Sequence, residues 1–153
     1  MLAFGFATVF TLLPVYYINE AELTPFQLVL VGTVLESTVF IFEVPTGVVA
    51  DVYSRRLSVI IGTLLLGIGL AIEGAIPAVV AIFIGEVIRG IGHTFTSGAM
   101  EAWLASEIGA ETVGNVYLRG NQVEQGASLL GIATSVALAR WGLHAPILAG
   151  ALI

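Results

Sequence analysis

The sequence contains no cysteine and no lysine, and only 10% of its 153 residues are charged. Without cysteine, disulfide frameworks, thiolate nucleophiles and cysteine metal sites are excluded. The arginines form no basic patch that would suit nucleic acid, and no phosphate-binding glycine loop, histidine cluster or nucleophile elbow is found. The sequence therefore gives no reason to expect an enzyme, a cofactor, a metal site or a nucleic-acid partner.

Apolar residues are abundant, since 58% of the chain is hydrophobic. Soluble domains are about 45–50% apolar and about 25% charged. One small core could not hide so many apolar side chains from water, whereas a lipid bilayer is itself an apolar solvent. The composition therefore predicts an integral membrane protein. No basic region precedes the first apolar stretch, so no signal peptide is expected.

Long apolar runs separated by short polar turns predict one all-α transmembrane bundle over residues 1–153. The predicted helices are 1–18, 26–50, 56–73, 77–104, 116–139 and 146–153. About 20 residues are needed to cross a bilayer, so the last run is too short. We therefore expect five complete helices and part of a sixth, in a piece of a longer protein. A polar loop is expected over residues 106–115.

Local signals mark helix starts and helix packing. Thr24, Pro25 and Gln27 predict an N-cap, a first-turn proline and a capping box at the start of the second helix. Small residues spaced four apart let helices approach closely in lipid. Two such sets are Gly90, Thr94, Gly98 and Ala102 on the fourth helix, and Ala127, Gly131, Ser135 and Ala139 on the fifth.

The arginines also predict the orientation of the bundle. Arg55, Arg56 and Arg119 are expected in the loops after the second and fourth helices, whereas Arg140 alone follows the fifth. Because cytoplasmic loops carry an excess of arginine and lysine, this bias places the N-terminus and the Arg55–Arg56 turn in the cytoplasm.

Polar side chains recur inside the predicted helices. A charge facing lipid costs about 2.5–3.5 kcal/mol near the bilayer centre, so these side chains are expected to face protein or a water-filled cavity. They form three stripes: Glu36 and Glu43 on the second helix; Glu86, Arg89, His93, Ser97 and Glu101 on the fourth; Asn121, Glu124, Gln125 and Ser128 on the fifth.

Most of these residues have two interpretations. Glu43 could cap or pair near the cytoplasmic end, or it could take part in ion coupling. Glu36 lies deeper and could hold a proton or be a buried pairing partner. Arg89 could pair with Glu86 three residues earlier, or it could bind an anionic solute group or alter a neighbouring carboxylate.

The remaining polar positions are open in the same way. His93 could relay protons, or it could simply pack within the bundle. Glu124 could be a coupling carboxylate or a structural one. Glu73, at the end of its helix, is expected to be solvated.

The turn between the second and third helices carries the most informative motif. A glycine is followed four residues later by an aspartate, and a basic pair stands four and five residues beyond it: Gly47, Asp51, Arg55 and Arg56. This spacing resembles the signature loop of the major facilitator superfamily. Residues 43–46 are similar to a variant of many bacterial members, and residues 89–103 to their fourth helix. The chain departs at Val52, where the family usually has arginine or lysine, and at Ser54, where glycine is common.

The resemblance implies a transporter of twelve helices in two six-helix halves, with the solute bound between them. This chain would be most of the N-terminal half, in a bacterial inner membrane. Asp51 would act in gating by approaching a helix N-terminus of the missing C-terminal half. Arg55 and Arg56 would pair with acidic groups near the cytoplasmic ends, of which Glu101 is the nearest. The glycine–proline run of drug–proton antiporters is absent from residues 116–139.

The expected function is therefore secondary active transport of a small solute by alternating access, with protons as the coupling ion. The expected partners are that solute, the lipid bilayer and the missing half. The alternatives are a membrane sensor or assembly subunit that transports nothing, or an inactive fragment. In those cases the polar stripes would join helices to one another. The sequence does not specify the solute, the direction of transport or the oligomeric state.

Overall fold

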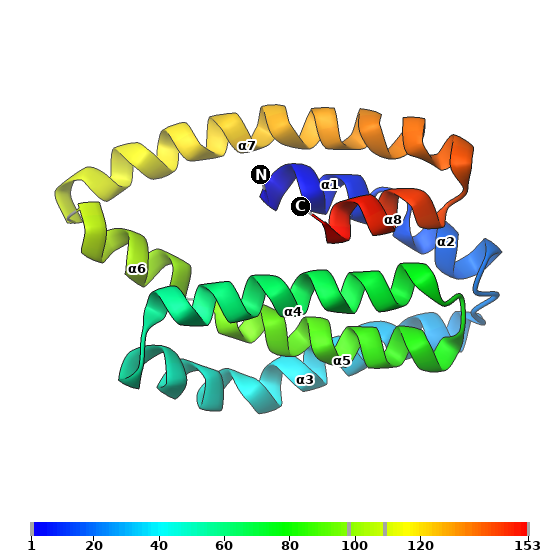
Figure 1. The fold of residues 1–153 in the computed structure, drawn as a ribbon, viewed down its shortest axis with the longest axis horizontal. Coiled ribbons are helices and arrows are strands. Elements are labelled where there is room, and N and C mark those ends of the chain that lie inside the picture. The colour runs from blue at the N-terminus through cyan, green and yellow to red at the C-terminus, as the bar shows by residue number, and fades with distance from the viewer. Residues whose placement is uncertain (1, 98, 109, 153) are drawn as a thin grey trace.

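The computed structural model describes residues 2–97, 99–108 and 110–152 and is drawn in Figure 1. Its helices are α1 (Leu2–Phe10), α2 (Leu13–Asn19), α3 (Pro25–Val52), α4 (Arg55–Ala75), α5 (Val79–Thr96), α6 (Ala99–Ile108), α7 (Ala110–Leu138) and α8 (His144–Ala151), with a 3-10 turn, η1 (Ala139–Trp141), before α8. The described residues contain helices and no strand, which confirms the all-α prediction.

By length and composition, three helical stretches of the described chain could cross a membrane: Pro25–Val52, Arg55–Ala75 and Val79–Leu104. A shorter apolar stretch spans Ala3–Asn19. The 29 residues of α7 are long enough to cross a membrane, but its polar stripe makes this helix less apolar than those three stretches. The chain is thus a multi-pass helical membrane protein. That it has five complete membrane helices and part of a sixth stays a prediction.

The first predicted helix, 1–18, is divided in the structure. α1 ends at Phe10 and α2 begins at Leu13, with Pro14 in the first turn of α2. A proline is tolerated in the first turn of a helix, because a backbone N–H there would have no partner within the helix. Further inside a helix its ring would clash with the carbonyl four residues earlier, here that of Phe10, so the helix is interrupted.

The region after α5 also differs from the prediction. The expected helix 77–104 is wrong as a single element, because α5 ends at Thr96 and Ser97 has an extended ψ of 127°. The expected loop over 106–115 is wrong as well. α6 continues to Ile108 and α7 begins at Ala110, since this polar stretch contains no proline to stop a helix. Arg119 consequently lies within α7 rather than in a loop.

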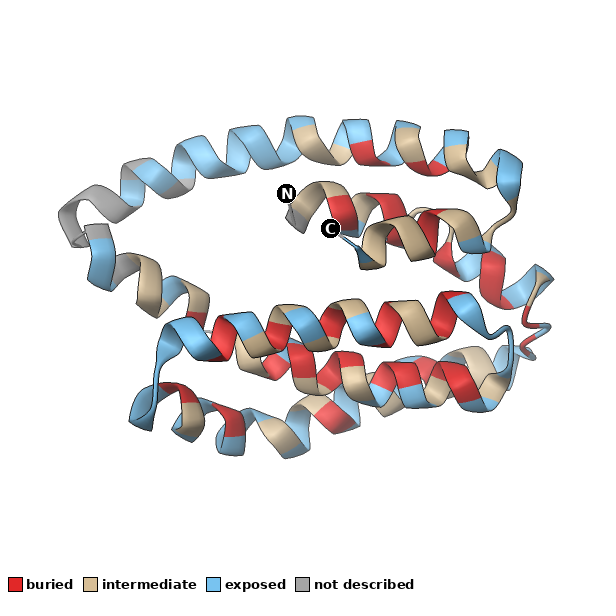
Figure 2. Cartoon of the chain, in the orientation of Figure 1, coloured by how far each residue is buried: buried red, intermediate tan, exposed pale blue. Residues whose placement is uncertain are grey.

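The helices form two groups joined by α8. α3, α4 and α5 pack together, and α7 packs along α1 on the opposite side, as Figure 1 shows. α8 contacts both α1 and α4 and therefore connects the groups. In Figure 2 the buried residues gather on α4 and α5, while α7 is exposed along much of its described length.

Glycines bring α4 and α5 into backbone contact. A methyl group built on Gly62 would lie 2.7 Å from the carbonyl oxygen of Gly92, and one on Gly69 would lie 2.7 Å from that of Gly85. In each helix the two glycines are seven residues apart, so they share one face. The two antiparallel helices therefore have no room for a side chain at either crossing.

The predicted small-residue packing is confirmed at two positions. A methyl on Gly90 would lie 2.9 Å from Thr38 Cβ of α3, and one on Gly131 would lie 2.6 Å from the carbonyl oxygen of Phe4 of α1. Ser135, one turn after Gly131, is fully buried. Gly98 lies outside the described residues.

The predicted capping box at the start of α3 is also confirmed. The Thr24 hydroxyl accepts from the Gln27 backbone N–H at 3.3 Å, and the Gln27 side chain accepts from the Thr24 N–H at 2.8 Å. Pro25 is the first residue of the helix. These bonds satisfy backbone donors that have no partner inside a helix.

Candidate functional site

Three charged side chains are buried where α2 meets α4 and α5. Glu73 of α4 is 0% exposed, and Glu86 and Arg89 of α5 are 1% and 6% exposed. Glu86 and Arg89 share a face of α5 because they are three residues apart. Gly85 allows Glu73 to reach them, since a methyl group on Gly85 would overlap Glu73 Cγ. The α4–α5 crossing therefore positions the whole cluster.

Arg89 contacts both carboxylates but unequally. Its Nη2 donates a hydrogen bond to Glu86 Oε1, whereas its Nε lies 3.5 Å from Glu73 Oε1 without forming a hydrogen bond. The guanidinium also lies over the ring of Phe10, with 5.0 Å between Cζ and the ring centroid. This cation–π contact ties α1 to the cluster. Arg89 is thus the direct partner of Glu86 and a more distant neighbour of Glu73.

Two adjacent tyrosines of α2 complete the cluster. The Tyr17 hydroxyl lies 2.6 Å from Glu73 Oε2 and 3.2 Å from Glu86 Oε1. The Tyr16 hydroxyl donates to the backbone carbonyl of Glu73 at 2.7 Å. Both tyrosines are buried in the largest apolar core of the described chain. Tyr17 is the side chain that bridges the two carboxylates.

The cluster has one more acidic group than basic groups. With both carboxylates ionised it carries one net negative charge in surroundings that exclude water. Burying an uncompensated charge is costly, and in proteins such a group is usually neutralised. In the described chain Glu73 Oε1, Glu86 Oε2 and Arg89 Nε have no hydrogen-bond partner. The arrangement is therefore suited to receive one positive charge.

Sequence reasoning found part of this cluster. Of the two interpretations of Arg89, the structure shows the ion pair with Glu86. The expectation for Glu73 is wrong, because α4 continues to Ala75 and α2 packs over the last turn. Tyr16 and Tyr17 were not identified. The sequence did carry a signal for them, because two adjacent tyrosines stand near the end of an apolar run. Buried tyrosine hydroxyls usually find hydrogen-bond partners, so such a pair indicates a polar contact inside the bundle.

The other predicted positions do not join this cluster. His93, Glu36, Glu43 and Glu124 are exposed on α5, α3 and α7. Glu101 is exposed as well and lies on α6. The predicted five-residue stripe on one helix is therefore wrong, because α5 ends at Thr96, before the fourth member, Ser97.

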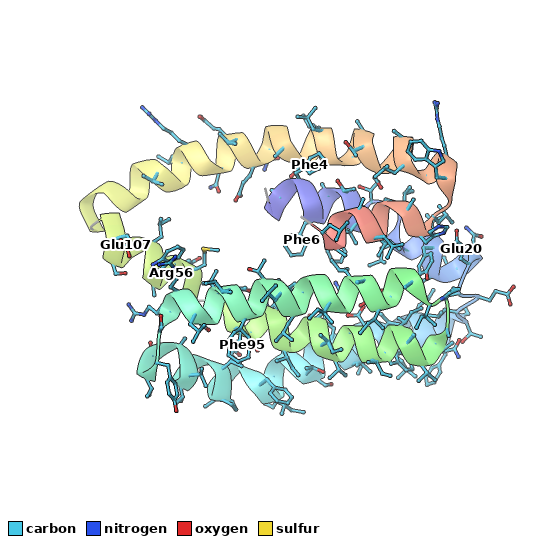
Figure 3. All side chains as sticks on the ribbon, viewed as in Figure 1. Phe4, Phe6, Glu20, Arg56, Phe95 and Glu107 are labelled. Carbon is cyan, nitrogen blue, oxygen red and sulfur yellow. The ribbon has the colours of Figure 1, made fainter. Side chains whose placement is uncertain are left out.

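The signature turn lies at the other end of α4. Gly47 and Asp51 are in the last turns of α3, and Arg55 and Arg56 are the first residues of α4. All four are exposed, and Arg55 Nη2 lies 3.6 Å from Asp51 Oδ1. Figure 3 shows Arg56 at the end of the molecule opposite Glu20. An exposed pair of this kind contributes only about 0–1 kcal/mol.

A second polar contact joins α2 to α8. Glu20, just after α2, accepts a hydrogen bond from the Leu143 backbone N–H at 2.8 Å and lies 3.5 Å from His144 Nδ1. Gly142 precedes these residues with a φ of 121°, a conformation that favours glycine. This contact fixes the start of α8 against the end of α2.

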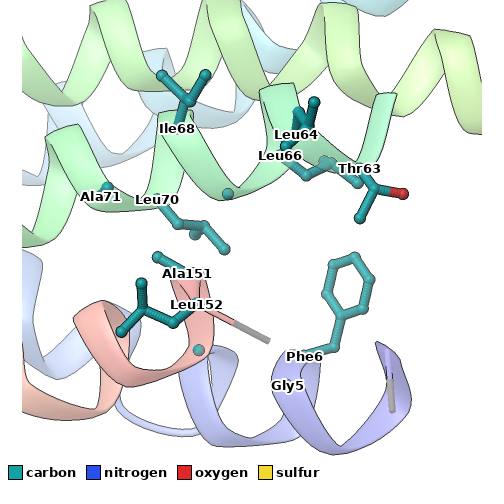
Figure 4. A pocket seen from close by; sticks show the side chains of 12 residues that line it. Gly5, Phe6, Thr63, Leu64, Leu66, Ile68, Leu70, Ala71, Ala151 and Leu152 are labelled. Carbon is teal, nitrogen blue, oxygen red and sulfur yellow. The ribbon is translucent and has the colours of Figure 1, made fainter. Parts of the chain in front are cut away.

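A cavity of about 430 Å³ lies between α1, α4 and α8 (Figure 4). Its lining is almost entirely apolar, with Phe6, Leu64 and Leu152 around it and Thr63 as a hydroxyl-bearing neighbour. None of the polar residues singled out from the sequence lines it. The cavity therefore offers no charged group for binding an ionised solute.

The chain is similar to a known family and to a known protein. A family model described as "Sugar (and other) transporter" matches residues 4–124. The "Uncharacterized MFS-type transporter YxaM" of Bacillus subtilis (strain 168) is 25% identical over 115 residues, which are 75% of this chain and 29% of that protein. The chain thus spans less than a third of the length of this relative. No solved structure gives a significant match.

Proposed function

The chain belongs to the sugar (and other) transporter family of the major facilitator superfamily, and from this we propose that it forms part of a secondary transporter. In this proposal it is most of the N-terminal half and moves a small solute by alternating access with a second half. The observation that carries the proposal is the family match over residues 4–124, in a chain that is helical and rich in membrane-spanning segments. The family points to transport rather than to enzymatic catalysis.

The buried charges support the same function. Ionisable groups within membrane helices are rare because of their cost, and they commonly mark solute or ion pathways. Here Glu73, Glu86 and Arg89 are buried within helices of that kind, in contact with one another. A bundle that needed only to be stable could use apolar side chains at these positions.

We place gating at the signature turn. The Asp51 side chain is 73% exposed and its pair with Arg55 is long, so little free energy holds Asp51 to its own half. A helix N-terminus of the second half would attract this carboxylate in one conformation and release it in the other. The N-terminus and this turn lie in the cytoplasm of a bacterial cell in this proposal.

Glu36, Glu43 and Glu124 remain candidates for ion coupling. All three are exposed in the described structure, on α3 and α7. Exposure to lipid would be costly, so these faces would meet the second half or a water-filled cavity. Glutamine at each position, followed by measurement of solute-driven proton movement in vesicles, tests this role. Parental behaviour of all three variants would contradict it.

Water access to α7 tests alternating access directly. The chain has no cysteine, so single probes can be placed at Ser128, which is partly exposed, and at Ser135, which is fully buried. These positions are seven residues apart on one helix and form a matched pair. Oriented vesicles of the full-length gene product would be treated with a membrane-impermeant maleimide.

We expect Ser128→Cys to react from one side of the membrane and Ser135→Cys to remain unlabelled. Addition of a transported solute, once a screen finds one, should reduce the labelling of Ser128→Cys. If neither cysteine reacts with the maleimide from either side of the membrane, this part of α7 lies in a dry interface. That result would refute a water-filled transport cavity beside α7 and favour a subunit that transports nothing.

A further inference from the structure

We propose that Glu73 is a proton-binding site and that Tyr17 changes its hydrogen-bond partner when the proton binds. The groups that face this site are Tyr16 and Tyr17 of α2, Glu86 and Arg89 of α5, and the ring of Phe10 of α1. Use of this proton for coupling rests on the proposed transport function, but its binding does not.

The unequal contacts of Arg89 decide which carboxylate takes the proton. Arg89 donates directly to Glu86, and the two form a neutral pair. Glu73 is fully buried, and the guanidinium Nε is 3.5 Å away without a hydrogen bond. Glu73 is therefore the group whose negative charge is least compensated. A proton from water that binds to it leaves the whole cluster neutral.

Tyr17 is placed to respond to this proton. Its hydroxyl has one hydrogen to donate but lies within reach of both Glu73 Oε2, at 2.6 Å, and Glu86 Oε1, at 3.2 Å. When Glu73 is ionised, Tyr17 donates to Glu73. When Glu73 is protonated, its own O–H donates to the Tyr17 oxygen, and the Tyr17 hydrogen turns to Glu86.

This exchange involves no reactant other than the proton. The proton forms one O–H bond on the Glu73 carboxylate, the Tyr17 hydroxyl rotates, and no bond between heavy atoms is formed or broken. The three residues belong to α2, α4 and α5, so protonation changes the contacts between three helices. A transporter could use such a change to link proton binding to helix movement.

Infrared difference spectroscopy of the purified full-length gene product tests the site without a known solute. On acidification we expect a C=O stretching band from a buried carboxylic acid, which Glu73→Gln should abolish. Tyr17→Phe should shift this band, because the acid loses its hydrogen-bond acceptor. Tyr16→Phe is the matched control, since the Tyr16 hydroxyl donates to the Glu73 backbone carbonyl and not to its carboxylate, and it should leave the band in place.

The outcomes separate the two proposals. A band that persists in Glu73→Gln, or no band in the parent, would overturn the proton site and leave the accessibility test of transport unaffected. If Glu73→Gln does not fold, an unchanged band in Tyr17→Phe would overturn the exchange. If the band is lost in Glu73→Gln and the Ser128→Cys variant never reacts with the maleimide, the proton site is supported and alternating access is contradicted.

Discussion

Substitution of Gly85 by alanine should destabilise the bundle, because the α4–α5 crossing has no space for a methyl group. The added carbon would overlap Glu73 Cγ and would lie 2.9 Å from both Glu73 Oε1 and the carbonyl oxygen of Gly69. Overpacking of a well-packed interior costs about 1–3 kcal/mol. Because one of the displaced groups belongs to the charged cluster, we expect a value toward the upper end.

Helix propensity acts in the opposite direction and must be separated from packing. Alanine is favoured over glycine inside a helix by about 1 kcal/mol. Gly32 of α3 provides the matched control, since a methyl group there would meet no atom within 4 Å. Both substitutions gain the same propensity, so the difference between Gly85→Ala and Gly32→Ala isolates the packing cost of about 1–3 kcal/mol.

The assay is unfolding of the purified protein in mixed micelles with an increasing fraction of denaturing detergent. Circular dichroism reports the helix content, and the free energies of unfolding of the two variants are compared with that of the parent. We expect Gly32→Ala to match or exceed the parent and Gly85→Ala to fall below it. Equal stability of the two variants would refute the close α4–α5 approach.

Three further predictions concern charged groups. Arg89→Met should destabilise the protein by about 3–5 kcal/mol, because it leaves buried carboxylates without a counter-charge, and detergent unfolding would measure this loss. Asp51→Asn should slow turnover while membrane insertion and solute affinity stay unchanged. Measurements of flux and of solute binding on one preparation check this prediction, and unaltered turnover would contradict it. Glu20→Ala should lower the free energy of unfolding by about 1 kcal/mol, because the Leu143 N–H loses its acceptor. Glu20→Gln should lower it clearly less, because the glutamine oxygen still accepts from the Leu143 N–H and the half-exposed contact with His144 contributes little.

Sequence reasoning worked where the signal is local or compositional. The apolar content indicated membrane helices, and Thr24 with Gln27 identified a helix start that the structure confirms. It failed where tertiary contacts decide. Residues 107–108 and 110–115 were expected in a loop but are helical, because polar residues without proline are compatible with either helix or loop.

The candidate site shows the same division. The ion pair of Arg89 with Glu86 was one of two interpretations offered by the sequence, since a separation of three residues on one helix brings side chains together. The contacts of Tyr17 with Glu73 and Glu86 join residues more than fifty positions apart, and Arg89 meets Glu73 from a different helix, so no spacing rule predicts these contacts. A signal did exist in the glycine pairs of α4 and α5. Once aligned in antiparallel order, these glycines set the register of α4 against α5, and the missing side chain at Gly85 lets Glu73 reach toward Arg89.

Two groups of charged residues lie at the opposite ends of α4. Glu73 lies about 27 Å along that helix from Arg55, at 1.5 Å per residue. At one end the charged groups of α4 and α5 are buried in contact with each other, whereas at the other Asp51 and Arg55 are exposed and weakly paired. In the proposed alternating mechanism, the two halves move against each other and exchange the contacts at their exposed surfaces. The buried end is therefore suited to hold a proton through the movement, and the exposed turn is suited to break and reform contacts with another half.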